Sequence, residues 1–319
     1  MPLRAVVIVN PNATRTTPRG RDVLASALTG EVETEVVLTQ ARGHASEIAR
    51  KAVAADVDVI VVLGGDGTVN EVVNGMLADV TPDYAAAHIP LLGIVPGGST
   101  NVLARAVGLP RDPVEATGAL LESLRRGSAR TIGLGRANDR FFTFGAGLGL
   151  DAEVVELVER RRDEGARSTA ALWVRTAARH LLTKPGRHAA QMSAVSATGE
   201  VAEAITTLIV SNSTPWTYLG SRAIHANPTA SFDSGLDVLA LLTARRTATV
   251  RMAASLLRPE GPRGRRTLRW VDVAGVTVRA SQPVAAQVDG DYLGVVTEMR
   301  FCAVPDALRI AVPGGSESA

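Results

Sequence analysis

The stretch Gly64-Gly65-Asp66-Gly67-Thr68-Val69-Asn70, continuing as Glu71-Val72-Val73-Asn74-Gly75, decides the fold of this chain. It follows the apolar run 57–63 and leads into a segment of helical composition at 69–77. Glycines at a strand-to-helix turn let backbone amides approach a phosphate, and the first helical turn offers unpaired N–H groups to it. The stretch therefore predicts a phosphate-binding turn in an α/β domain. The alternative is an ordinary turn with Thr68 as the helix N-cap.

A second glycine turn, Pro96-Gly97-Gly98-Ser99-Thr100-Asn101, follows the strand-like run 91–95. Ligands of open α/β sheets generally bind in a crevice at the carboxyl ends of the strands, so the two turns are predicted to line one crevice. Ser99 or Thr100 could instead only cap the following helix. Neither turn has the spacing of a Walker A or GxGxxG motif.

The pattern of the chain predicts two architectures. In the first third, strand-like runs at 5–9, 36–39, 57–63 and 91–95 alternate with helical segments at 20–28, 44–54 and 69–77, as in a parallel sheet with helices on both faces. A helical segment near 113–126 follows. Short strand-like runs then favour an antiparallel β-sandwich, at 129–134, 140–144, 192–195, 204–211, 236–242, 268–273, 276–280 and 284–288.

Two helices are expected to interrupt the sandwich, at 152–162 and 168–182, and Glu156 stands four residues before Arg160 for an ion pair in the first of them. A length of 319 residues fits two domains. We predict an α/β domain at 1–130 and a β-sandwich at 131–304. The apolar stretch 308–312 suggests that 305–319 rejoins the first domain.

Composition limits the classes of partner and compartment. The 34 basic and 32 acidic residues nearly balance, which argues against a nucleic-acid binder. The single cysteine, Cys302, excludes an internal disulfide and a cysteine zinc site and fits the cytoplasm. No run of about 18 apolar residues and no secretory signal are evident, so membrane contact is expected to be peripheral and transient, at the inner face. Arginine-rich stretches at 160–162 and 258–269 would favour an anionic surface.

Other catalytic patterns are missing from the sequence. The five histidines lack HExxH spacing, and no Gly-x-Ser-x-Gly nucleophile elbow occurs. The glycines of 145–149 lack the spacing of a dinucleotide turn, so we interpret them as a site of close packing.

The two glycine turns carry a family resemblance. GGDGTVNEVVNG, followed about thirty residues later by PGGSTNVLAR, resembles the catalytic domain of diacylglycerol kinases, which is similar to sphingosine and ceramide kinases. The resemblance is tight over residues 5–110 and looser over the rest of the chain. It implies an N-terminal domain that binds ATP beneath the GGDGT loop and a C-terminal β-sandwich that helps to form a lipid cleft.

The resemblance also implies which residues bind the nucleotide. By motif position they are Asn10, Thr39, Gly64, Gly65, Asp66, Gly67, Thr68, Asn70, Gly98, Ser99 and Thr100. The carboxylate of Asp66 would organise Mg²⁺ and phosphate oxygens or accept the substrate's proton. Alternatively, Asp66 only fixes the turn by accepting from backbone amides.

A second carboxylate is implied near the C-terminus. The segment Val288-Asp289-Gly290-Asp291 resembles the VDGE segment of the family, whose last acid is the general base toward the lipid hydroxyl. Asp291 stands at that position and is one methylene shorter than Glu, so it must sit closer to the hydroxyl or act through a water. Asp-Gly is also a common hairpin turn.

The segment 230–237 resembles the stretch that binds Mg²⁺ in some bacterial members. It suggests Ser231, Asp233 and the backbone of Leu236 as ligands. Ser234 stands where those members have a second acid, which removes a charge that a hard cation prefers. Val102 likewise stands where many relatives have Asp.

These observations predict an ATP- and Mg²⁺-dependent kinase that transfers the γ-phosphate to a lipid hydroxyl, with diacylglycerol as the favoured lipid. The predicted partner is a lipid presented by a membrane surface, with a homodimer left open. Two alternatives remain, an enzyme like NAD kinase, which shares a GGDGT loop, and a nucleotide- and lipid-binding regulator without turnover. The sequence does not select among lipid acceptors.

Overall fold

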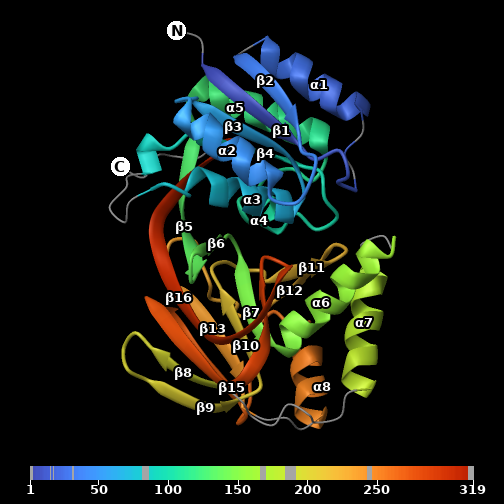
Figure 1. Ribbon diagram of the computed structural model, residues 1–319, viewed down its shortest axis with the longest axis vertical. Helices are drawn as coiled ribbons and strands as arrows, with labels where there is room; N and C mark the ends of the chain where they lie inside the picture. Colours follow the sequence, from blue (N-terminus) through green and yellow to red (C-terminus); the bar gives the residue numbers. More distant parts are fainter. Residues whose placement is uncertain are drawn as a thin grey trace. The chain divides into compact units, whose positions relative to one another are not determined.

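The computed structural model describes residues 3–14, 16, 18–30, 32–80, 86–165, 170–183, 192–242 and 246–314 (Figure 1). The chain divides into two compact units. The first unit comprises residues 1–133 together with 306–319, and the second comprises residues 134–305.

The first unit contains a parallel sheet. Its strands are β1 (Arg4–Val9), β2 (Glu33–Leu38), β3 (Val59–Gly64) and β4 (Leu91–Pro96), in the order β4-β3-β1-β2. The end of β16 (Asp291–Ala311) adds a further parallel strand beside β4, with Ile310 opposite Leu92. Every residue of β3 is buried, as expected for a central parallel strand covered on both faces.

Helices cover this sheet. They are α1 (Pro18–Thr29), α2 (His44–Ala54), α3 (Asp66–Met76), α4 (Val102–Ala106) and α5 (Pro113–Arg126), with a 3-10 turn, η1, at Ala86–His88. Leu28 of α1 and Leu120 of α5 share one apolar core with Val61 of β3, while α2 and α3 pack together over the other face (Figure 1). A Cβ at Gly75 would lie 2.2 Å from the Ser46 carbonyl oxygen, so glycine permits this helix contact.

The second unit is antiparallel. Its strands are β5 (Ala129–Ala137, which begins in the first unit), β6 (Arg140–Phe142), β7 (Gly145–Gly149), β8 (Met192–Ser196), β9 (Val201–Ile205), β10 (Thr207–Ser211), β13 (Leu236–Leu241), β14 (Thr267–Val273) and β15 (Gly275–Val288), with a separate hairpin of β11 (Thr217–Leu219) and β12 (Arg222–Ile224). The central order is β14-β13-β10-β7-β15-β16. The predicted fold class, parallel α/β followed by antiparallel β, is confirmed.

A bend in β15 lets this sheet enclose a core. The register with β16 shifts between Arg279 and Val284; the residues before the shift pair with β8, and those after it pair with β7. Runs 276–280 and 284–288 are therefore one bent strand. Inside, the rings of Phe142 and Phe301 meet edge to face, with their centroids 6.3 Å apart. A Cβ at Gly135 would lie 2.0 Å from the Phe142 ring, so glycine makes room for it.

Three helices complete the second unit: α6 (Leu150–Asp163), α7 (Ala170–Thr183) and α8 (Arg246–Ser255). The first two correspond to the predicted helices at 152–162 and 168–182, although residues 168–169 lie outside the described residues. The predicted ion pair from Arg160 to Glu156 is present at 2.6 Å. Helix α8 and the β11–β12 hairpin were not predicted. The run 204–211 also differs from prediction, because Ala204 has φ +60° and two strands, β9 and β10, meet there.

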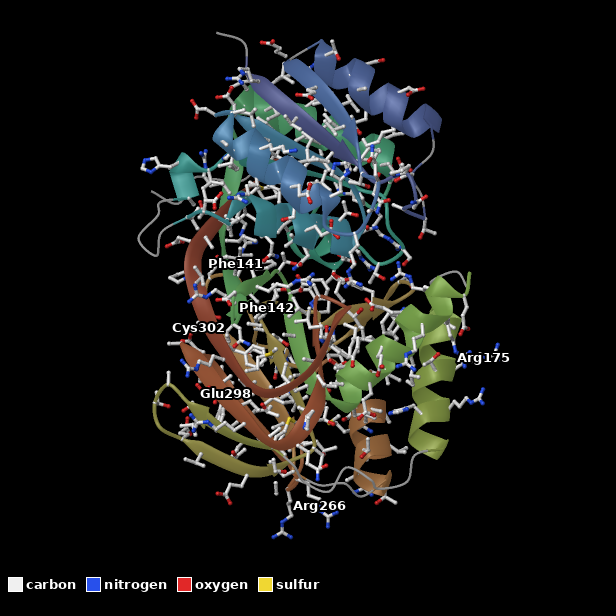
Figure 2. All side chains as sticks on the ribbon, viewed as in Figure 1. Phe141, Phe142, Arg175, Arg266, Glu298 and Cys302 are labelled. Atoms are coloured by element: carbon white, nitrogen blue, oxygen red, sulfur yellow. The ribbon has the colours of Figure 1, made fainter. Side chains whose placement is uncertain are left out.

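Among the described residues, no helix is both long and apolar enough to cross a membrane. The arginine side chains of the second unit include Arg175 on α7 and Arg266, which extend away from the ribbon (Figure 2). The predicted membrane contact stays a prediction.

Candidate active site

The predicted nucleotide residues gather at one edge of the parallel sheet. Thr39 follows β2, and its amide donates to the Val9 carbonyl at 2.8 Å. Asn10 follows β1, and its amide donates to the Leu63 carbonyl at 3.0 Å. Because all four strands run in the same direction, their following residues share the edge where α/β proteins bind ligands.

The two glycine turns lie against each other at this edge. The Gly97 amide donates to the Gly64 carbonyl at 2.7 Å. A Cβ at Gly98 would lie only 2.6 Å from the Gly65 Cα, and a Cβ at Gly65 would lie 3.2 Å from the Gly98 Cα. The turns predicted to line one crevice are thus adjacent, and glycine is needed for their approach.

The first turn presents a helix N-terminus. Helix α3 begins at Asp66 with Gly65 as the N-cap residue, and no side chain caps it. Thr68 is therefore not the cap; its Oγ1 instead accepts from Asn10 Nδ2 at 2.9 Å. The first-turn amides of this 11-residue helix thus have no capping side chain, which suits an anion.

The second turn is built differently. The Gly98 amide donates to Asn101 Oδ1 at 3.0 Å, and Asn101 Nδ2 donates back to the Gly98 carbonyl at 2.9 Å. Asn101, with φ +51°, is the N-cap residue of α4, so neither Ser99 nor Thr100 occupies that position. Because the Gly98 amide is already used, Gly98 serves the site through its lack of a side chain. Ser99, which is exposed, and Thr100, which is half-buried, offer hydroxyl groups.

Asp66 connects the two turns. Its Oδ1 accepts from the amide of Val102, the first residue of α4, at 2.6 Å. A charged acceptor makes this bond stronger than a neutral pair would. Asp66 therefore fixes backbone, as the alternative interpretation expected, but the backbone that it fixes is at the end of the second turn.

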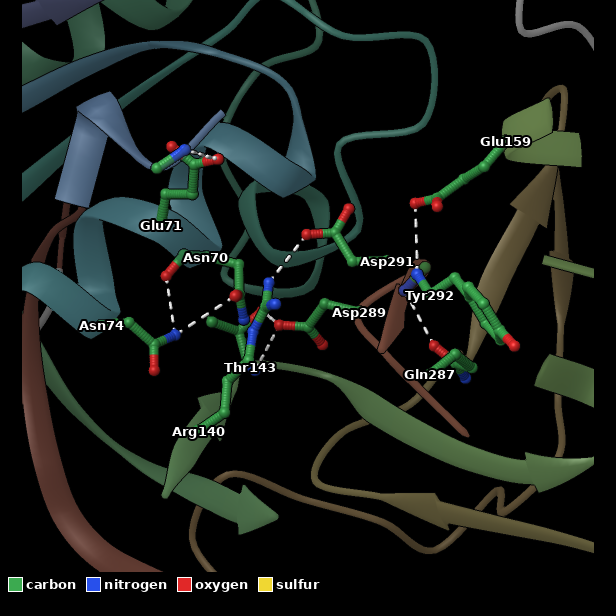
Figure 3. A network of polar contacts seen from close by, with 12 residues as sticks. Asn70, Glu71, Asn74, Arg140, Thr143, Glu159, Gln287, Asp289, Asp291 and Tyr292 are labelled. Atoms are coloured by element: carbon green, nitrogen blue, oxygen red, sulfur yellow. Dashed lines mark hydrogen bonds and ion pairs between the residues drawn. The ribbon is translucent and has the colours of Figure 1, made fainter. Parts of the chain in front are cut away.

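Asn70 lies away from the turns. It is completely buried, and its side-chain oxygen accepts from Asn74 Nδ2 at 3.2 Å (Figure 3). These bonds give Asn70 a part in supporting α3, and its predicted contact with the nucleotide stays a prediction. Glu71, next in sequence, accepts from the Gly43 amide at 2.9 Å and ties α3 to the loop after Thr39. The contact of Glu71 was not predicted from the sequence, although Glu71 is a charged residue within the glycine motif.

Thr16 is a candidate that sequence reasoning missed. Its Oγ1 is buried without a hydrogen-bond partner in the described part of the chain. That atom would lie 2.8 Å from a Cβ at Gly97. A buried hydroxyl without a partner calls for an acceptor, and a phosphate oxygen beside the glycine turns would supply one. The residues at this edge therefore fit a phosphate group.

In the second unit, Asp289 is held firmly. Its Oδ2 accepts from the amide and hydroxyl of Thr143 at 2.7 and 2.9 Å (Figure 3). Its Oδ1 accepts from the amides of Phe144 and Gly145 at 3.0 and 3.1 Å. Only 4% of Asp289 is exposed. These bonds assign Asp289 to anchoring the turn.

Asp291 is placed differently, as the first residue of β16. Asp289 and Gly290 have φ values of +49° and +81°, so the Asp-Gly pair does form a hairpin turn between β15 and β16. The Asp291 side chain is 19% exposed, and its Oδ2 accepts from Arg140 Nη2 at 2.7 Å (Figure 3). The hairpin therefore coexists with an accessible, oriented carboxylate. Arg140 was not singled out from the sequence.

The proposed metal turn closes on itself. Ser234 Oγ donates to the carbonyls of Ser231 and Gly235, and the Asp233 amide donates to Ser231 Oγ at 3.2 Å. Within the described ranges, no group of three His, Cys, Asp or Glu residues is arranged to hold a metal ion. The side chains of this turn bond to the turn itself. The assignment of Ser231, Asp233 and the Leu236 backbone as Mg²⁺ ligands stays a prediction.

Together, the fold and these residues define a class: an α/β unit whose glycine turns fit a phosphate group, followed by an antiparallel unit that carries a partly exposed acid, Asp291. Residues 4–139 match the diacylglycerol kinase catalytic domain model. Over these residues the chain is similar to the diacylglycerol kinase catalytic domain.

Curated relatives agree with this assignment over the N-terminal part. A diacylglycerol kinase of Bacillus subtilis is 34% identical over 148 residues, which cover 46% of each protein. One from Staphylococcus haemolyticus is 34% identical over 143 residues, covering 43% of this chain and 39% of that protein. The chain thus aligns with less than half the length of these relatives.

Solved structures extend the similarity of the fold to the whole chain. A crystal structure of a diacylglycerol kinase from Bacillus anthracis has a TM-score of 0.68 at 18% identity, covering 98% of this chain and 97% of that one. A second structure from the same organism reaches 0.75 with the same coverage. At this identity the likeness supports the fold, and function must be argued from the site.

Proposed function

We propose that this protein is an ATP-dependent lipid kinase that transfers the γ-phosphate to a lipid hydroxyl, with diacylglycerol as the first acceptor to test. One observation carries the proposal: the Gly65 and Gly98 turns touch at the carboxyl edge of a parallel sheet, in the segment that matches the diacylglycerol kinase catalytic domain. The names of the relatives supply the acceptor.

In this proposal the first unit binds the nucleotide. The amides at the start of α3 contact phosphate oxygens, and the hydroxyls of Ser99, Thr100 and Thr16 complete the surroundings. Asn10 orients Thr68, and Asp66 holds the two turns together. Thr39, Gly64 and Gly67 form the backbone around the phosphates at the carboxyl edge of the parallel sheet. Mg²⁺, which accompanies ATP in kinases, neutralises charge on the phosphates when bound.

The second unit supplies the proton acceptor. Asp291 takes the proton of the lipid hydroxyl as that oxygen attacks the γ-phosphorus, while ADP leaves. Phosphoryl transfer depends mainly on positioning and charge stabilisation, and one group that removes the proton completes the requirement. Arg140 keeps the carboxylate oriented between turnovers.

The lipid reaches the enzyme from a membrane surface. The exposed arginines of the second unit, such as Arg175 and Arg266, fit attraction to anionic headgroups. Binding to vesicles containing phosphatidylglycerol should weaken with added salt, whereas neutral vesicles should bind poorly. Equal binding to both kinds of vesicle would contradict this part of the proposal.

The decisive experiment incubates the pure protein with labelled ATP, Mg²⁺ and a panel of acceptors. The panel contains diacylglycerol, monoacylglycerol, sphingosine, ceramide, phosphatidylglycerol and NAD. We expect labelled phosphate on a lipid and none on NAD. Label on NAD alone would replace the proposal with an NAD kinase, and nucleotide binding without any transfer would indicate a regulator.

A further inference from the structure

The turn that carries Asp291 is contacted on both sides by groups linked to α6. The Gly290 amide, just before Asp291, donates to Gln287 Oε1 at 2.9 Å. The Tyr292 amide, just after it, donates to Glu159 Oε1 of α6 at 3.1 Å (Figure 3). The backbone N–H groups of the residues before and after Asp291 thus both donate to side chains.

Gln287 is itself held by α6. It is 3% exposed, and its Nε2 donates to Oδ2 of Asp151, in the first turn of α6, at 2.7 Å. A carboxylate only accepts hydrogen bonds, so Asp151 sets which end of the Gln287 amide faces the Gly290 amide. A flipped amide would put two donors together at Gly290.

The packing around Asp151 shows that the contact is close. A Cβ at Gly147 of β7 would lie 1.9 Å from Asp151 Oδ2, so a glycine strand makes room for the acid. Burial raises the pKa of Asp151 to about 6, an unfavourable setting for a carboxylate with only a structural task. At neutral pH the group is ionised and accepts from Gln287.

We propose that Asp151, Gln287 and Glu159 are positioning residues, which hold the Gly290 and Tyr292 amides so that Asp291 points at the acceptor hydroxyl. The inference rests on the proposed function, because Asp291 needs a fixed direction only if it takes that proton. Displacement of a reacting group by about 1 Å can cost about 100-fold in rate. The contacts therefore serve turnover more than nucleotide binding.

The test uses a donor–acceptor swap. Gln287→Glu faces Asp151 with a second carboxylate, so at pH 8 the Gly290 contact should loosen. We expect kcat to fall about tenfold to 100-fold, with the KM for ATP unchanged and faster hydrogen exchange at the Gly290 amide. The double variant D151N/Q287E restores a donor facing an acceptor and should recover most of kcat. Gln282→Glu, exposed on the same strand, is the matched control and should behave as wild type.

The outcomes separate cleanly. Unchanged kcat in a Gln287→Glu protein with faster Gly290 exchange would overturn the positioning role. A parallel loss of kcat, ATP affinity and melting temperature, not repaired in the double variant, would also overturn it. If the wild-type protein transfers phosphate to no lipid, the proposed function fails and the catalytic role of these contacts falls with it. Slow Gly290 exchange in Gln287→Glu would show that even the contact is misassigned.

Discussion

The two candidate sites, one in each unit, are built in opposite ways. In the first unit, the phosphate site consists mainly of backbone that follows adjacent parallel strands, with Gly65 and Gly98 in contact. In the second unit, Asp291 is oriented by side chains from distant parts of the chain, and Arg140 lies 151 residues away in sequence. A site made from local turns tolerates changes on its surface, whereas a site made from long-range pairs depends on each partner.

The largest effect is expected at the partly exposed acid, Asp291. Asp291→Asn removes the proton acceptor while keeping its shape, so kcat should fall about 10³-fold with ATP affinity unchanged. Steady-state kinetics with the preferred lipid, together with nucleotide titration, measure both. Asp139→Asn, an exposed carboxylate elsewhere in the second unit, should leave kcat intact. Full turnover in the Asp291→Asn protein would remove Asp291 from catalysis.

The anchoring acid should govern stability instead. Asp289→Asn turns one acceptor atom into a donor that faces the Thr143 and Gly145 group of donors, so unfolding should become easier by about 3 kcal/mol. Urea denaturation checks this value. An Asp289→Asn variant as stable as the wild type would contradict the anchoring role. It would also remove the predicted difference between Asp289, which stabilises the fold, and Asp291, which serves turnover.

The glycine contact of the first unit offers a further comparison. Gly98→Ala places a Cβ 2.6 Å from the Gly65 Cα, so the turns must separate, with a loss of about 2 kcal/mol and weaker ATP binding. Gly118→Ala, in α5 with open space around it, should instead stabilise the protein by about 0.5–1 kcal/mol. Thermal melting and ATP titration of both variants test the pair. Equal behaviour would mean that the turns are not in tight contact.

A last effect concerns pH. Burial raises the Asp151 pKa to about 6 from 3.8, so between about pH 4 and 6 the folded state binds more protons than the unfolded state. Stability should therefore fall as pH rises through that window, by at most about 1.4 kcal/mol per pH unit from this group. Asp151→Asn should flatten that slope in urea denaturation measured at several pH values. An unchanged slope would place the titration elsewhere.

How much of the fold and of the candidate sites could be predicted from the sequence depends on the same difference between local turns and long-range pairs. Glycine-rich turns after apolar runs are signals contained in a short stretch of sequence. The parallel sheet, the adjacent turns and the positions of Asn10 and Thr68 beside them could therefore be predicted. Asp289, Arg140 and Gln287 act through partners more than a hundred residues away, and no local pattern announces such pairs. For Asn70, the motif could not show that its side chain is buried.

Secondary structure was missed where local preference was weak or tertiary contacts decided. The hairpin of β11 and β12 has strands of three residues, too short to give a periodic pattern. The bend of β15 between Arg279 and Val284 is a register shift with its partner strand, which a single segment does not reveal.

Strand β16 has a consequence for how the protein is made. Its last residues complete the parallel sheet beside β4, and Leu308 and Ile310 are fully buried there. During synthesis, residues 1–133 leave the ribosome long before these residues exist, with an edge of β4 still open. The first unit therefore finishes folding only after the whole second unit has been translated, so a chain that ends at residue 305 should lack the strand that completes the first unit.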